Sequence, residues 1–290
     1  MPNTRDIRRR IKSIKNTAQI TKAMQMVAAS KMRKAQQLAL AGRPYASLIN
    51  KILAHAQIGS EEIHPLLQKR EVKKVGVILI STDKGLCGSL NTNLLREAGH
   101  CDPATTKFVT LGRKGKAFLV RAKRDLIADF EMKESPTLAY TKQISQFMID
   151  AFMKGEIDQI DLLFTNFIST INQKPARKQL VPILELKQLQ AGFEKGSPQT
   201  IETLDTQATF EPDASSVLGA LLPHYIHFQV YHAYLESKAS EHSARMVAMK
   251  NATDNAKQII KDLTLEYNKV RQAGITKELL EITTAQMAMS

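Results

Sequence analysis

The two ends of the chain carry the hydrophobic spacing of helices that pack along another helix. From residue 239 to residue 270, apolar or small side chains recur at alternating steps of three and four residues. Such a heptad repeat is typical of a left-handed coiled coil. A weaker series of the same kind, rich in alanine, runs from residue 7 to residue 35. The seam positions are Ile7, Ile11, Ile14, Ala18, Thr21, Gln25, Ala28, Met32 and Ala35 in the first series, and Ala239, His242, Met246, Met249, Thr253, Ala256, Ile260, Leu263, Tyr267 and Val270 in the second.

Glycine and proline are distributed so that both ends can be uninterrupted helices. Residues 3–41 contain neither, and residues 224–290 contain only Gly274, whereas residues 44–212 hold 10 of the 13 glycines and 8 of the 10 prolines. A proline costs about 3 kcal/mol and a glycine about 1 kcal/mol inside a helix. We expect the two end helices to pair antiparallel within one chain, because the middle of the chain can bring them together. Parallel pairing between two chains is the alternative.

The last residues of the chain are unusual for an exposed helix end. After Glu281 the sequence contains no charged side chain. A helix end surrounded by water normally carries solubilising charge. Because the C-terminal series is the longer one, we expect its end to extend beyond its partner and to lie in apolar surroundings.

The middle of the chain alternates the patterns of strands and helices. We expect strands at Val75–Ser81, Phe108–Leu111, Asp125–Phe130, Ile160–Ile168 and Val181–Leu186. Helices are expected between them at Leu90–Ala98, Lys114–Ala122 and Thr137–Lys154. Such alternation predicts a mostly parallel sheet covered by helices. Residues 187–212 contain two glycines and two prolines, and this composition predicts a loop that leads into the C-terminal helix.

These patterns together predict an α/β protein with two parts. A long antiparallel coiled coil of the N- and C-terminal helices is joined to a central Rossmann-like α/β domain with a mostly parallel sheet. The expected divisions are an N-terminal coiled-coil helix at 1–55, a central α/β domain at 70–190 and a C-terminal coiled-coil helix at 210–290.

Two glycine-containing turns of the middle region resemble phosphate-binding loops. The turn at Asp83–Ser89 would lie at the carboxyl ends of the strands, where open sheets usually bind ligands. Neither this turn nor Gly112–Lys116 matches the G-x-x-x-x-G-K-[ST] or G-x-G-x-x-G pattern. We therefore interpret Gly85 and Gly88 as residues that allow positive φ in a tight turn, with a phosphate site as the alternative.

Cysteine and histidine give no strong candidate for catalysis or metal binding. Cys87 and Cys101 cannot build a disulfide scaffold and lack the paired spacing of a zinc site. No histidine follows Cys87 closely enough in sequence to suggest a base, so a buried small side chain is the favoured interpretation. His232 and His242 are expected in the packed core. We assign no catalytic, cofactor-binding or metal-ligating residue.

Positive charge is concentrated in the first helix. The chain has a formal net charge of +13, and residues 1–43 hold eleven basic side chains against Asp6 alone. Three partners would fit this charge: an acidic protein surface, a membrane surface or a nucleic acid. No aromatic residue lies in 1–43, which weakens single-strand nucleic-acid binding. No apolar stretch approaches the ~20 residues of a membrane span, so we expect no direct membrane insertion. The arginine-rich start could be a transit peptide, but the helical pattern runs on through it, and we read it as mature sequence.

Several motifs resemble those of one family. The segments Ile20–Gln36 (ITKAMQMVAASKMRKAQ), Ser81–Gly88 (STDKGLCG), Ala244–Asn255 (ARMVAMKNATDN) and Ile275–Ile282 (ITKELLEI) are similar to the γ subunit of bacterial F-type ATP synthases. The motifs occur in the family's order and extend over essentially the whole chain.

This resemblance implies a mechanical role without catalysis or a cofactor. The paired end helices would stand in the ring of α and β subunits, and the α/β domain would dock, with the ε subunit, on the membrane c-ring. Rotation driven by ions would then couple to ATP synthesis or hydrolysis at the β sites, on the cytoplasmic face of a bacterial inner membrane. A basic coiled-coil protein that binds nucleic acid is the alternative function.

The resemblance also implies which side chains make the coupling contacts. Met24, with Lys22 and Lys31, matches the coupling region, and Arg245 matches the contacting part of the shaft. The residues expected to engage β near the C-terminus are Arg271, Gln272, Thr276, Glu278 and Glu281. Many family members follow the last motif with Gly-Ala, where this chain has Ala285-Gln286.

Overall fold

The computed structural model describes residues 4–42, 44–45, 48–49, 52–53, 64–134, 136–183, 211 and 213–289. The chain divides into two units: Met1–Ser30 with Arg245–Ser290, and Lys31–Ala244. Two long helices contribute to both units, α1 (Thr4–Ala41) and α6 (Ala214–Met289). Each unit is described separately below.

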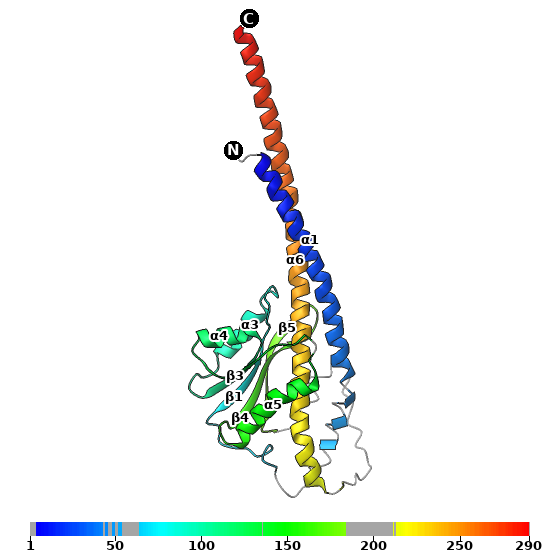
Figure 1. Ribbon diagram of the computed structural model, residues 1–290, viewed down its shortest axis with the longest axis vertical. Helices are drawn as coiled ribbons and strands as arrows, with labels where there is room; N and C mark the ends of the chain where they lie inside the picture. Colours follow the sequence, from blue (N-terminus) through cyan, green and yellow to red (C-terminus); the bar gives the residue numbers. More distant parts are fainter. Residues whose placement is uncertain are drawn as a thin grey trace. The chain divides into compact units, whose positions relative to one another are not determined.

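In the first unit, α1 and α6 run side by side in opposite directions (Figure 1). The Thr21 hydroxyl bonds to that of Thr253, and Arg8 Nη2 donates to the Tyr267 hydroxyl at 2.6 Å. Moving 13 residues back along α1 therefore corresponds to moving 14 residues forward along α6. The pairing is antiparallel, as predicted.

Burial follows the predicted seam. Every seam position of the first unit is buried or half-buried, and most of the α1 positions between them are exposed. Ile7, Ala28 and Met249 have at most 5% of their surface exposed. The heptad pattern therefore identified the contact face of both helices.

The second unit is built on a five-stranded sheet with the order β3-β2-β1-β4-β5 (Figure 1). The first four strands are parallel, and β5 is antiparallel to β4. The strands are β1 (Val75–Ile80), β2 (Thr106–Leu111), β3 (Asp125–Phe130), β4 (Gln159–Phe167) and β5 (Gln173–Val181). The helices that join them are α3 (Leu90–Gly99), α4 (Arg113–Arg121) and α5 (Leu138–Met153). The predicted mostly parallel sheet is thus confirmed.

The alternation of side chains along β1 separates two apolar layers. Ile78 and Ile80 point into a layer shared with α5 and the first part of α6. Val77 and Leu79 point to the opposite face, where α3 and α4 cover the sheet. Because successive residues of a strand face opposite sides, a run that is apolar throughout is expected in a strand buried on both faces.

The fifth strand was predicted in the wrong place. It runs over Gln173–Val181, so the expected Val181–Leu186 shares only its first residue with the strand. Pro182 and Ile183 lie outside the strand, and residues 184–186 lie outside the described residues. The actual strand is an edge strand rich in polar side chains, with Pro175 inside it. Charge and proline are common on edge strands because they prevent pairing with other chains, and they hide the hydrophobic signal.

The C-terminal helix begins earlier than its breaker-free stretch. It includes Gly219 and Pro223, and Asp213 accepts hydrogen bonds from the Ser216 amide at 2.6 Å and the Ser216 hydroxyl at 3.0 Å. These bonds lower the pKa of Asp213. Leu222 and Tyr225 are buried in the apolar layer on both sides of the proline. We attribute the continuity of the helix to this burial, because packing overrides local propensity. The predicted loop at 187–212 lies outside the described residues except for Glu211.

Candidate functional site

The seam of the first unit combines small side chains with a buried polar pair. Thr21 and Thr253 are 9% and 3% exposed, and their hydroxyl oxygens are 2.7 Å apart. Thr253 Oγ1 also lies 2.8 Å from the Met249 carbonyl oxygen, to which it can donate. Because both hydroxyls have partners inside the seam, the pair fixes the register of the two helices without leaving a buried polar group unsatisfied.

Outside the seam, α1 presents a second line of apolar side chains. Ile20 and Val27 are 60% and 54% exposed, and Met24 between them is half-buried. The steps of four and three residues place the three on one face of the helix. Met24 was predicted as a contact residue from the sequence, whereas Ile20 and Val27 were not. Their steps of four and three residues, the same as those of the seam, could have identified them in the sequence.

The predicted coupling residues of α1 fall into different units. Lys22 is exposed and Met24 half-buried in the first unit. Lys31 belongs to the second unit, where it forms an ion pair with Glu134. Arg245, at the start of the first unit's part of α6, is only 9% exposed. Lys31 is therefore engaged within its own chain, which the sequence did not indicate.

The predicted C-terminal contact residues all lie on one exposed part of α6. Every described residue from 271 to 289 is exposed. Thr276 Oγ1 donates to the Gln272 carbonyl at 3.0 Å, and Lys277 pairs with Glu281 at 3.5 Å. The structure thus gathers Arg271, Gln272, Thr276, Glu278 and Glu281 on a helical segment that extends past the first described residue of α1.

The apolar face of this segment is not a continuation of the seam. The heptad steps after Val270 would select Gly274, Lys277 and Glu281, which are not hydrophobic. The exposed apolar side chains are instead Ile275, Leu279, Leu280, Ile282, Met287 and Met289. A change of face at the point where α1 begins indicates that this segment is adapted to a different neighbour.

The glycine turns of the second unit do not form an open phosphate site. At the N-terminus of α4, the Arg113 amide donates to Asp83 Oδ1 at 3.0 Å and the Gly115 amide to Ser81 Oγ at 2.8 Å. The Lys114 amide donates to the Thr82 carbonyl at 3.0 Å. Amides that would hold a phosphate are therefore already bonded to the segment after β1.

The turn after β1 differs in one detail from its expected geometry. Gly88 has a positive φ of 60°, as predicted, but the other residue of the turn with positive φ is Leu86 at 62° rather than Gly85. Asn91 Nδ2 stabilises the turn by donating to Thr82 Oγ1 at 2.8 Å and to Cys87 Sγ at 3.3 Å. Leucine can adopt this conformation here because the turn is held by these bonds and by its neighbours.

The two cysteines and three of the histidines, His227, His232 and His242, are part of the packed interior. Cys87 and Cys101 are buried, and burial raises the pKa of the Cys101 thiol, which disfavours a reactive thiolate. His232 and His242 are each 7% exposed, as expected for core residues. His227 Nδ1 lies 2.7 Å from Ser145 Oγ between α6 and α5, and burial lowers its pKa to about 4. The described residues contain no group of three or more potential metal ligands.

Comparison with known sequences gives matches along the entire chain. The ATP synthase family model matches residues 3–289. The chain is 51% identical to the ATP synthase gamma chain of Opitutus terrae over 293 residues, which is 99% of each chain. It is 50% identical to the ATP synthase gamma chain of Methylacidiphilum infernorum over 296 residues, which is 100% of each chain.

Solved structures with a similar fold include chains of mitochondrial ATP synthases. A chain of the central stalk and c-ring of the Tetrahymena thermophila enzyme gives a TM-score of 0.60 at 26% identity, covering 80% of this chain and 99% of that chain. A chain of the Euglena gracilis enzyme gives a TM-score of 0.68 at 20% identity, covering 99% and 94%, and supports the fold alone. From the full-length family match and the two relatives near half identity, the chain belongs to the γ-subunit family of F-type ATP synthases.

Proposed function

We propose that this chain is the central rotor shaft of an F-type ATP synthase. It would couple ion-driven rotation of a membrane ring to ATP synthesis or hydrolysis at catalytic sites on other subunits. The observation that carries the proposal is the segment from 271 to 289, in which every described residue is exposed although several side chains are large and apolar. A helix of this kind requires a surrounding partner, and the γ-chain relatives identify the assembly.

The proposed partners are the α and β subunits around the paired helices and the ε subunit and c-ring at the α/β domain. One similar structure is a chain of a central stalk with a c-ring, and another belongs to a rotor, which supports a place for this chain in the rotor of such an assembly. The chain itself would be non-catalytic and would need no cofactor. The bonded amides at the start of α4 support this view, because they are not free to bind phosphate.

Coupling requires the shaft to bind one conformation of the ring more tightly than the next. A partner shifts a conformational equilibrium only through its differential affinity for the two states. We propose that Lys22, Met24 and Arg245 provide such contacts along the paired helices, with Lys31 at the start of the second unit. Nearer the C-terminus, the contacts would come from Arg271, Gln272, Thr276, Glu278 and Glu281.

The proposed location is the cytoplasmic face of a bacterial inner membrane, as a peripheral part of the complex. The bacterial origin of the relatives supports it. Among the described residues, no helix is both long and apolar enough to cross a bilayer.

Copurification from the native source tests the rotor proposal directly. A tag on this chain should recover α-like and β-like subunits, each at about three copies per copy of this chain. Recovery of the folded chain without them would overturn the proposal. The nucleic-acid alternative has no support from the relatives. It predicts retention of DNA or RNA on filters with an affinity that falls steeply with salt, and we expect no specific retention at physiological salt.

A further inference from the structure

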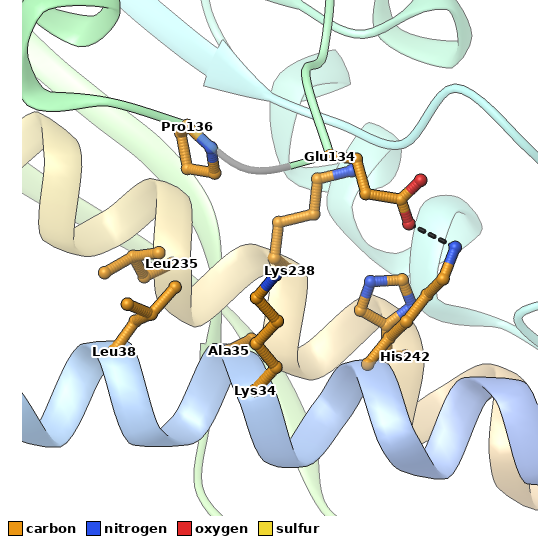
Figure 2. Close-up of a pocket in the computed structure, with 9 residues that line it drawn as sticks. Lys34, Ala35, Leu38, Glu134, Pro136, Leu235, Lys238 and His242 are labelled. Carbon is orange, nitrogen blue, oxygen red and sulfur yellow. Dashed lines mark ion pairs between the residues drawn. The ribbon is translucent and has the colours of Figure 1, made fainter.

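A recess in the second unit lies between α1, α6 and the segment that joins β3 to α5 (Figure 2). Its volume is about 170 Å³. All of its walls belong to the unit Lys31–Ala244. The lining residues are Lys31, Lys34, Ala35, Leu38, Glu134, Pro136, Leu235, Lys238 and His242.

One end of the recess is basic. Three lysines and a histidine line it, against the single carboxylate of Glu134. Glu134 pairs with Lys31, and the Lys238 ammonium lies 3.4 Å from Glu241, which is outside the lining. Lys34 makes no ion pair with any residue that the structure describes. After these two ion pairs are counted, the Lys34 ammonium still leaves the recess with positive charge.

Two of the side chains at this end are largely removed from water. Lys238 is 8% exposed and His242 is 7% exposed. Charges removed from water interact more strongly with an ion nearby. The pKa of Glu134 is lowered, first by its hydrogen bond from Lys31 and then by the charges of Lys31, Lys238 and His242. These three basic side chains therefore all act on the Glu134 carboxyl group.

The other end of the recess is apolar. Figure 2 shows Leu38 of α1 and Leu235 of α6 facing each other, away from the Glu134 ion pair. Ala35 and Pro136 complete this wall. Pockets that combine an apolar body with a few polar groups are suited to small organic ligands.

We propose that this recess is a binding site for a small amphiphilic anion, namely a carboxylate on a short aliphatic body. The carboxylate lies among Lys34, Lys238 and His242, and the aliphatic part contacts Leu38 and Leu235. Inorganic phosphate supplies the charge without the apolar contact, and a neutral alcohol supplies the contact without the charge. Both should therefore bind more weakly. The site does not depend on the rotor function, because it requires only the second unit of this chain.

Methyl NMR of the purified full-length chain provides the test. Leucine methyl groups are labelled with ¹³C, and hexanoate is added at constant pH and ionic strength. We expect saturable shifts of the Leu38 and Leu235 methyl signals in the millimolar range. 1-Hexanol and inorganic phosphate should each need at least a tenfold higher concentration for half-saturation.

A pair of lysine variants separates site binding from general charge. Lys34→Gln removes the lining ammonium and should weaken hexanoate binding at least tenfold, whereas Lys22→Gln, also exposed on α1 but outside the lining, should leave it unchanged. Lys238→Met provides a second lining variant, and its unliganded methyl spectrum reports whether the fold is intact. Absence of saturation, equal binding of 1-hexanol or phosphate, or equal effects of Lys34→Gln and Lys22→Gln would each overturn the proposal.

Discussion

The hydroxyl oxygens of Thr21 and Thr253 lie 2.7 Å apart in the buried seam between α1 and α6. Each hydroxyl also lies within hydrogen-bond distance of a carbonyl oxygen one turn earlier in its own helix, that of Ala18 or Met249. One threonine can therefore donate to its helix and accept from the other threonine. This arrangement joins the two helices through a buried polar contact in an interface made mostly of apolar and small side chains.

Replacing either threonine by valine should destabilise the paired helices slightly. Thr21→Val and Thr253→Val each remove the shared bond at nearly constant volume, and we expect each to cost about 1 kcal/mol. The double variant should cost less than the sum of the two, because the bond between the two hydroxyls is lost only once. Urea unfolding of the full chain, followed by helical circular dichroism, measures this difference. Strict additivity would show that the two hydroxyls do not interact in solution.

His227 should make the stability of the chain depend on pH. Burial, with smaller contributions from the charges of Lys142 and His224, lowers its pKa from 6.5 to about 4. Between pH 6.5 and pH 4 the unfolded chain binds a proton that the folded chain does not bind. The free energy of unfolding should therefore fall as the pH decreases through this window and level off below it, with a contribution of about 2–3 kcal/mol from this histidine.

The variant His227→Asn isolates this contribution because it cannot be protonated. When the free energies of unfolding of both proteins are measured from pH 7 to pH 4, the value for the native chain minus that for the variant should decrease as the pH falls. Other groups with lowered pKa values, such as His64 and Glu134, affect both proteins equally and cancel in the difference. Parallel curves across the window would contradict the assignment of a low pKa to His227.

Gly112 should be the glycine least tolerant of substitution in the turn before α4. Its φ is 98°, and an added Cβ would lie 2.5 Å from the Ser81 carbonyl oxygen. Gly112→Ala should therefore cost about 3 kcal/mol or more, through both strain and overlap with the backbone. Gly155 is the matched control, with a φ of 76° but no atom within 4 Å of the added Cβ. Gly155→Ala should cost about 1 kcal/mol, and equal losses in thermal unfolding would argue against the close contact at Ser81.

A charge at Met24 should reduce coupling more than assembly. Met24 is half-buried beside the exposed Ile20 and Val27, so Met24→Lys adds a cation to an apolar contact surface. In reconstituted complexes we expect nearly normal ATP hydrolysis with about half or less of the normal ion pumping per ATP, because a strong ionic contact would favour one orientation of the rotor. Met26→Lys is the control, since Met26 is exposed on another face of the same helix. Unchanged pumping in Met24→Lys, or the same loss in Met26→Lys, would remove Met24 from the coupling surface.

The sequence predicted the elements that are decided by local patterns. Heptad spacing located the contact face of α1, which starts at Ile7, and that of α6, which ends at Val270. It could do so because seam positions repeat at fixed intervals along a helix whatever the partner is. The helix predicted at Thr137–Lys154 agrees with α5 together with the residues that cap its two ends. At the first end, the Tyr140 amide donates to the Thr137 hydroxyl at 3.3 Å. Asp125–Phe130 forms the predicted third strand.

Features decided by distant contacts were not predictable in this way. β5 depends on pairing with β4, and its polar residues are those of an edge strand. The ion pair of Lys31 with Glu134 joins residues more than one hundred positions apart, and no local pattern indicates it. Leu86 adopts positive φ because its turn is held by bonds to Asn91, whereas a rule based on residue type selects Gly85.

The polar side chains that follow β1 also decide whether the start of α4 can bind phosphate compounds. Asp83 Oδ1 and Ser81 Oγ accept hydrogen bonds from the Arg113 and Gly115 amides, which is where a nucleotide would place its phosphates. An energy-converting assembly works among high and fluctuating concentrations of ATP, ADP and phosphate. Because a carboxylate and a hydroxyl of the chain itself already accept from these amides, the start of α4 does not offer them to the phosphates of such compounds.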